Sequence, residues 1–160
     1  MLSVPFLLHD VISPIFMFYF FPPLLGLAAA ANLLIDTLVF FLAIKFFSIH
    51  IAWRKALRML VALWLIGLVA DIGGSLFLTL IGTISLKTKT ILIDYYSIYS
   101  SPVSILFFAA AVVLSGFIIY WLDLIYLKGH LSKKQAARIA LIFALLAAPY
   151  SFLIPTSWIY

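Results

Sequence analysis

Four apolar runs, each long enough to cross a lipid bilayer, are the feature that most constrains how this chain can fold. They cover about residues 24–47, 59–86, 103–127 and 136–154 of the 160 in the sequence. A transmembrane helix needs about 20 predominantly apolar residues, and in lipid every backbone polar group must be satisfied internally. The sequence therefore predicts an all-α polytopic integral membrane protein, with four transmembrane helices in an antiparallel bundle.

The composition leaves room for a single membrane domain over residues 1–160. Hydrophobic residues make up 67% of the chain and charged residues 9%, whereas a soluble domain carries about a quarter charged residues. The chain has no cysteine, which excludes disulfides, thiolate metal sites and iron–sulfur clusters. We expect contact with the lipid bilayer and no cofactor.

The segment before the first span is interpreted as lying along the membrane surface. Residues 1–21 contain no Lys or Arg, and a Pro22–Pro23 pair marks a break before the first span. The aromatic side chains near the end of this segment suit the headgroup level of a bilayer. We therefore expect an interfacial N-terminal segment.

The basic residues predict the orientation in the membrane. Eight of the ten lysines and arginines flank or fill the first and third connections: Lys45, Arg54, Lys55, Arg58, Lys128, Lys133, Lys134 and Arg138. Because basic loops stay in the cytoplasm, the turns 48–58 and 128–138 are predicted to be cytoplasmic and both termini to lie outside. Basic residues at span ends meet anionic lipid headgroups, so the net charge of +5 does not indicate a nucleic-acid partner.

Two spans carry a carboxylate near the middle of the bilayer, Asp36 and Asp71. An ionisable side chain at this depth is costly and marks a functional site by default. Asn32 lies one helical turn before Asp36, and Ser75 lies one turn after Asp71. No cationic side chain lies at this depth, so at least one carboxyl is expected to be protonated at rest. The sequence predicts a proton- or ion-binding site formed by these four residues, with the identity of any metal left open.

The structural alternative is that the aspartates only hold the bundle in register. A neutral Asp could donate a hydrogen bond to Asn32 or to a backbone carbonyl, since polar side chains join helices in membranes. Two functions remain open. One is a small proton- or cation-coupled transporter or channel-like protein, which we expect to form a homo-oligomer because four helices enclose little volume. The alternative is a non-catalytic subunit or assembly factor of a larger membrane complex.

Small residues recur along the spans and predict close packing between helices. The second span places Gly67, Asp71, Gly74 and Gly82 roughly along one line, and the first has Gly26 four residues before Ala30. In the fourth span, Pro149 frees a backbone carbonyl that neighbouring helices have to accommodate.

The remaining polar residues argue against an enzyme without deciding the question. Asp123 lies about one turn before the basic turn 128–138, so we expect it to be solvated or paired with Lys128. His50 and His130 lie in the basic turns, where isolated histidines are usually solvated. Ser115 has no histidine at membrane depth to act as its base. No catalytic residue is assigned.

Overall fold

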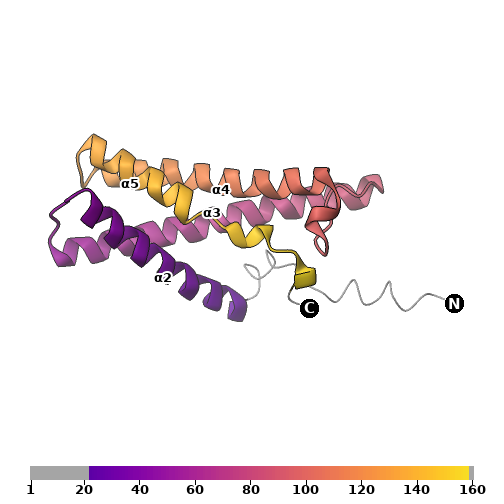
Figure 1. Cartoon of the computed structure of the whole chain (residues 1–160), viewed down its shortest axis with the longest axis horizontal. Coiled ribbons are helices and arrows are strands. Elements are labelled where there is room, and N and C mark those ends of the chain that lie inside the picture. Colours follow the sequence, from indigo (N-terminus) through magenta and orange to yellow (C-terminus); the bar gives the residue numbers. More distant parts are fainter. Residues whose placement is uncertain (1–21, 159–160) are drawn as a thin grey trace.

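The computed structural model describes residues 22–158, and its long elements are all α-helices. They are α2 (Pro22–Phe46), α3 (Trp53–Thr88), α4 (Pro102–Lys128) and α5 (Lys133–Leu146). Short 3-10 helices follow at η2 (Ile98–Ser100), η3 (Tyr150–Leu153) and η4 (Thr156–Trp158). Successive long helices run in opposite directions and pack against one another, as Figure 1 shows, which confirms the predicted all-α bundle. The expected interfacial segment 1–21 lies outside the described residues.

Four segments of the described chain are long and apolar enough to cross a membrane. The longest helix, α3, has 36 residues and measures about 54 Å at 1.5 Å per residue, whereas the hydrocarbon core is about 30 Å thick. Its first two turns carry Arg54, Lys55 and Arg58, which are exposed. The chain is therefore a multi-pass membrane protein whose apolar outer surface contacts lipid.

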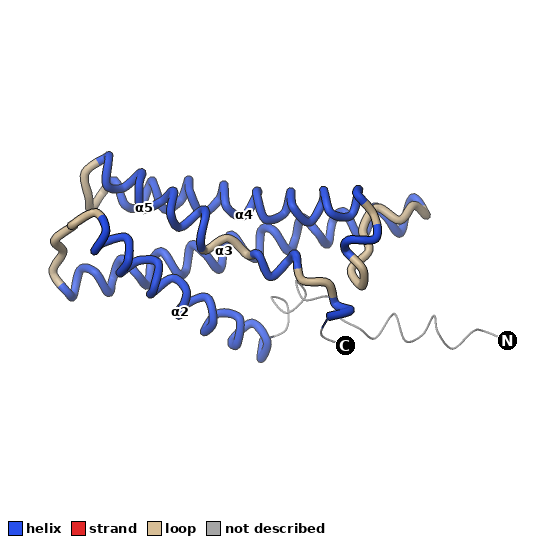
Figure 2. Tube along the Cα trace, in the orientation of Figure 1, coloured by secondary structure: helices blue, strands red, loops and turns tan. Residues whose placement is uncertain are grey.

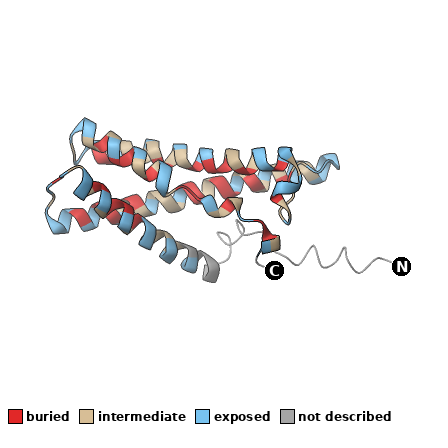
Figure 3. Cartoon of the chain, viewed as in Figure 1, coloured by how far each residue is buried: buried red, intermediate tan, exposed pale blue. Residues whose placement is uncertain are grey.

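The helices pack around two separate hydrophobic clusters. Near the basic turns all four long helices contribute to one cluster, which includes Phe40, Met59, Leu63, Ile119 and Phe143. A second cluster at the other end contains Leu78, Ile98, Phe108 and Phe152. The buried residues lie on the faces that the helices turn toward one another, and the outer faces are exposed (Figure 3).

Glycines allow the helices to approach closely, as the small-residue pattern predicted. A Cβ added at Gly116 on α4 would lie 3.1 Å from the carbonyl oxygen of Ala144 on α5. A Cβ added at Gly74 on α3 would clash with Ser115 and Phe152. By contrast, a Cβ at Gly26 would meet nothing within 4 Å. The packing glycines therefore lie in α3 and α4, and Gly26 has no such role in the described structure.

The fourth expected span, about 136–154, is α-helical only in its first part. The side chains of Ser132 and Gln135 form a capping box at the start of α5, and the helix ends at Leu146. Proline cannot donate a backbone hydrogen bond and restricts the residue before it, so the helix ends shortly before Pro149. Figure 2 shows the loop that follows α5 before the chain continues as η3.

Beyond η3, the chain pairs with the connection between α3 and α4. The backbone N–H groups of Thr156 and Ser157 donate to the carbonyl oxygens of Tyr95 and Tyr96, at 3.3 and 3.1 Å. The Tyr99 hydroxyl also donates to the carbonyl oxygen of Leu153 at 2.9 Å. These bonds satisfy backbone groups that a continuous helix would have satisfied itself.

Candidate functional site

Asn32 on α2 and Asp71 on α3 are in direct contact. The Asn32 Nδ2 donates a hydrogen bond to Asp71 Oδ2 at 2.5 Å. Asp71 is only 1% exposed, and Asn32 is half-buried. The predicted neighbourhood of these two residues is therefore present, and the contact joins two helices through polar groups.

Ser75 is fully buried on the same face of α3, one turn after Asp71. Its hydroxyl donates to the backbone carbonyl oxygen of Asp71 at 2.8 Å. Serines inside apolar helices commonly bond back to the carbonyl four residues earlier. The hydroxyl proton of Ser75 is thus used by the backbone and does not reach the Asp71 carboxylate.

The Asp36 carboxyl lies one turn of α3 away from Asp71, on the side of the basic turns. Its Oδ2 would lie 3.6 Å from a Cβ added at Gly67, which precedes Asp71 by one turn. Asp36 is 3% exposed. The Asp36 carboxyl therefore lies beside α3 at the level of Gly67. The four predicted site residues thus lie on two adjacent levels.

Asp123 on α4 corrects the sequence analysis. It is neither solvated nor paired with Lys128: its exposed fraction is 0%, and neither carboxylate oxygen has a hydrogen-bond partner among the described residues. Ile119 and Leu127, one turn to either side, are also buried. Counting from the end of α4 placed Asp123 near water, but the adjoining ends of the other helices cover it.

Asp36 and Asp123 are each buried beside the apolar cluster near the basic turns. The apolar cluster near the basic turns contains the residues one turn from each of them, Phe40 on α2 and Ile119 and Leu127 on α4. No described lysine or arginine forms an ion pair with either carboxyl. Among the described residues, no group of three or more His, Asp or Glu side chains is placed to hold a metal ion.

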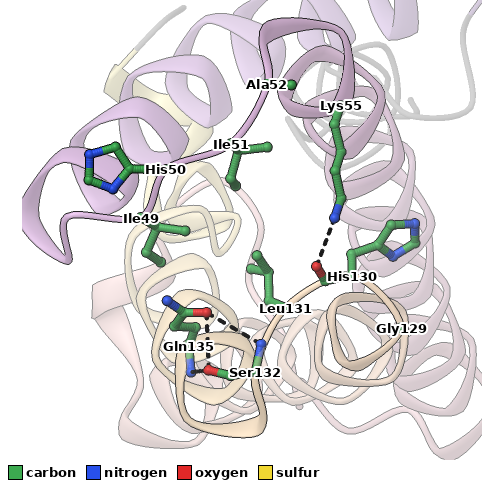
Figure 4. A pocket seen from close by; sticks show the side chains of 10 residues that line it. All are labelled: Ile49, His50, Ile51, Ala52, Lys55, Gly129, His130, Leu131, Ser132 and Gln135. Carbon is green, nitrogen blue, oxygen red and sulfur yellow. Dashed lines mark hydrogen bonds between the residues drawn. The ribbon is translucent and has the colours of Figure 1, made fainter.

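A separate polar pocket of about 510 Å³ lies between the two basic turns. Lys55 on α3 joins these turns, since its Nζ donates to the carbonyl oxygen of His130 at 2.9 Å. Figure 4 shows the rings of His50 and His130 on opposite sides of the pocket. The two histidines are thus not brought together, and the pocket is a feature that the sequence analysis did not predict.

Comparisons of this chain with protein-family models, characterised proteins and solved structures found no match. The buried carboxyls are therefore the feature of this chain that points to a function.

Proposed function

We propose that this four-span membrane protein is a small proton- or cation-coupled transporter or channel-like protein whose ion binds to buried carboxyls, including Asp36 and Asp71. The supporting observation is that three spanning helices each bury an aspartate, at 3%, 1% and 0% exposure for Asp36, Asp71 and Asp123. A charged carboxylate at the centre of a bilayer costs at least about 2.5–3.5 kcal/mol. A proton or a cation bound to these groups would offset that cost.

A proton is the ion that this arrangement favours. Hard cations such as Ca²⁺ take about 6–8 oxygen ligands, and no three described acidic or histidine side chains gather at one point. A proton needs only one oxygen. Asn32 would orient the Asp71 carboxyl through its hydrogen bond, and Ser75 would support the same turn of α3.

The alternative is a non-catalytic subunit or assembly factor of a larger membrane complex. The hydrogen bond between Asn32 and Asp71 favours it, because a bond between helices is what a purely structural aspartate would make. It does not explain Asp123, whose oxygens have no partner in the described part of the chain.

The proposed transporter is a homo-oligomer with a defined orientation in the membrane. Large side chains such as Phe40, Leu63 and Phe143 fill the bundle interior and are at most 1% exposed. A conducting path is therefore proposed to need a homo-oligomer. The basic turns are proposed to face the cytoplasm, because eight of the ten lysines and arginines lie at that end.

Proton flux into liposomes tests the proposal. Purified protein is reconstituted with a pH-sensitive dye inside, and a potassium diffusion potential drives proton entry. We expect flux above protein-free liposomes, and a loss of at least about tenfold in Asp36→Asn because that variant lacks a carboxyl that binds the proton. Asp94→Asn is the matched control, because Asp94 lies in the connection 89–101 and Asn can keep its turn.

Two outcomes would contradict transport. One is a folded wild-type protein that gives no proton flux and no flux of Na⁺ or K⁺. The other is flux that is equal in the wild type and in variants at each buried aspartate. Stable copurification with other membrane subunits, combined with absent flux, would support the alternative.

A further inference from the structure

We infer that the polar pocket between the two basic turns binds a phosphate group, and that an anionic phospholipid of the surrounding bilayer supplies it. This inference goes beyond the proposed function, because the pocket lies at one end of the bundle and its lining includes none of the buried aspartates. Lys55 and Gln135 are the residues that we expect to contact the phosphate oxygens.

The position of the pocket suits a lipid headgroup. Its walls include residues 49–52, in the connection between α2 and α3, and residues 129–132, in the connection between α4 and α5. Connections between spanning helices lie at the level of the bilayer surface, where the phospholipid headgroups are. The pocket has a volume of about 510 Å³, and sites for small organic molecules usually have about 300–1,000 Å³. It therefore has room for a phosphate group and the carbons next to it.

Two side chains offer hydrogen-bond donors to this pocket. The Lys55 ammonium has three N–H groups, and one of them donates to the carbonyl oxygen of His130 at 2.9 Å. The Gln135 amide oxygen accepts from the backbone N–H and the hydroxyl of Ser132, at 3.3 and 3.0 Å. The Gln135 Nε2 has no hydrogen-bond partner in the described part of the chain, so both side chains keep donors for phosphate oxygens. Figure 4 shows them on two sides of the pocket, with Leu131 between them.

The charge around the pocket favours an anion. None of its lining residues is acidic, and the first turns of α3 and α5 contain no acidic residue. Arg54 and Arg58 on α3 and Lys133 and Lys134 on α5 are exposed at the same end of the bundle. Ala52, which lines the pocket and precedes α3, has no side-chain oxygen to cap that helix. The positive end of the α3 dipole therefore borders the pocket without a side-chain cap.

The apolar part of the lining favours a lipid over free phosphate. Ile49 is buried, and Ile51 and Leu131 are half-buried. Free phosphate is polar on every side and gains nothing from these side chains, whereas the first acyl carbons of a phospholipid are apolar and are removed from water by contact with them. Anionic lipids also gather where lysines and arginines cluster at a membrane surface.

Lipid titration of the purified full chain tests the site. The protein is held in an uncharged detergent, and its melting temperature is measured against added phosphatidylglycerol, phosphatidylcholine or inorganic phosphate. A ligand that binds only the folded state raises the melting temperature with its concentration. We expect the largest rise with phosphatidylglycerol, because the choline cation of phosphatidylcholine cancels the charge of its phosphate and inorganic phosphate has no acyl chain.

Two lysine variants separate the site from the net charge. Lys55→Gln removes a cation that lines the pocket, and Lys134→Gln removes one at the same end of the bundle that does not line it. We expect Lys55→Gln to weaken phosphatidylglycerol binding by at least about tenfold, because it loses a charged hydrogen-bond donor, and Lys134→Gln to weaken it much less. Equal losses in the two variants would mean that net charge alone attracts the lipid, and would overturn the inference.

Gln135→Glu keeps the test decisive if Lys55→Gln folds poorly. A glutamate accepts the same bonds from Ser132, since Glu and Gln serve alike in a capping box, but it replaces the free donor with a negative charge. We expect the melting temperature without lipid to stay at or above the wild-type value, and the rise with phosphatidylglycerol to be lost. A rise that matches the wild type would contradict contact between Gln135 and the phosphate.

The inorganic phosphate arm identifies the source of the phosphate group. A rise with inorganic phosphate that Lys55→Gln abolishes, without any response to phosphatidylglycerol, would refute a lipid as the ligand. No response to either would refute the site itself. These outcomes are independent of proton flux, so the proposed transport is neither supported nor refuted by them.

Discussion

The side-chain amide of Asn32 donates to the carboxylate of Asp71 across two helices, joining residues that are 39 positions apart in the chain. One further polar contact holds the same two helices, since Trp64 Nε1 on α3 donates to the carbonyl oxygen of Ala29 at 2.8 Å. Figure 1 shows α2 diverging from the bundle toward its N-terminal end. These two bonds therefore attach to α3 the half of α2 that diverges from the bundle.

Removing the Asn32 amide should weaken this attachment. We expect Asn32→Ala to lower the free energy of unfolding in mixed micelles by about 1 kcal/mol, the usual size of a polar contact between membrane helices. A double-mutant cycle with Asp71→Ala measures the pair term. Thr37→Ala is the control, because the Thr37 hydroxyl bonds within α2 to the carbonyl oxygen of Leu33. A coupling energy near zero would mean that the contact does not stabilise the bundle.

The close approach of α4 and α5 predicts a difference between two glycines. Gly116→Ala would place a Cβ against the Ala144 carbonyl oxygen, which is backbone and cannot rotate away. We expect a loss of about 1–3 kcal/mol of stability from overpacking. Gly26→Ala should be neutral or slightly stabilising, because its Cβ meets nothing and alanine favours a helix. Equal melting temperatures for the two variants would contradict this packing.

Tyr95 predicts a loss of stability at alkaline pH. Burial raises the pKa of the Tyr95 phenol from its ordinary value of 10.0, and its hydroxyl donates to the Leu78 carbonyl oxygen at 3.4 Å. The unfolded chain ionises first, so the contribution is fully present below pH 10 and is lost as pH rises through the folded-state pKa. Thermal melts from about pH 8 to 11 should fall less steeply for Tyr95→Phe than for the wild type.

The control for this titration is Tyr96→Phe, which removes an exposed phenol from the same connection. Absorbance of the tyrosinate anion during the same titration reports ionisation directly. If Tyr95→Phe and the wild type lose stability with the same slope, ionisation of the buried phenol does not contribute.

The absence of cysteine from the sequence makes the orientation easy to test. Lys134→Cys lies on α5 beside the basic turn, and Ile91→Cys lies in the connection between α3 and α4, 80% exposed. In intact cells a membrane-impermeant maleimide should label Ile91→Cys and leave Lys134→Cys unlabelled until the membrane is opened. The reverse labelling pattern would invert the proposed orientation.

The helical class and the nearness of Asn32 to Asp71, within an expected cluster of four residues, could be predicted from the sequence because both depend on distances along single helices. An apolar run of bilayer length is a local signal. Asn32 and Asp71 carry polar groups at similar depth in consecutive antiparallel spans. The similar depth of the two residues and the order of their spans in the sequence were therefore enough to place these two side chains near each other.

The burial of Asp123 could not be predicted in the same way. Its depth was counted from the end of α4, but its exposure depends on where the other helices begin and end. α3 starts at Trp53, earlier than the predicted span at about 59, and α5 starts at Lys133. These extra turns help to extend the apolar cluster past the level of Asp123. Likewise, hydropathy alone predicted a fourth span that continues through Pro149. The backbone restrictions of proline instead end α5 at Leu146.

The length of α3 has a mechanical consequence. This helix extends from the basic turn at Trp53 to Thr88, so its two ends emerge on opposite sides of the bilayer. A straight helix that is longer than the layer it crosses moves both of its ends when it tilts. If α3 tilts about the level where it meets Asp36, the polar pocket at one end and the paired loops at the other are displaced in opposite directions.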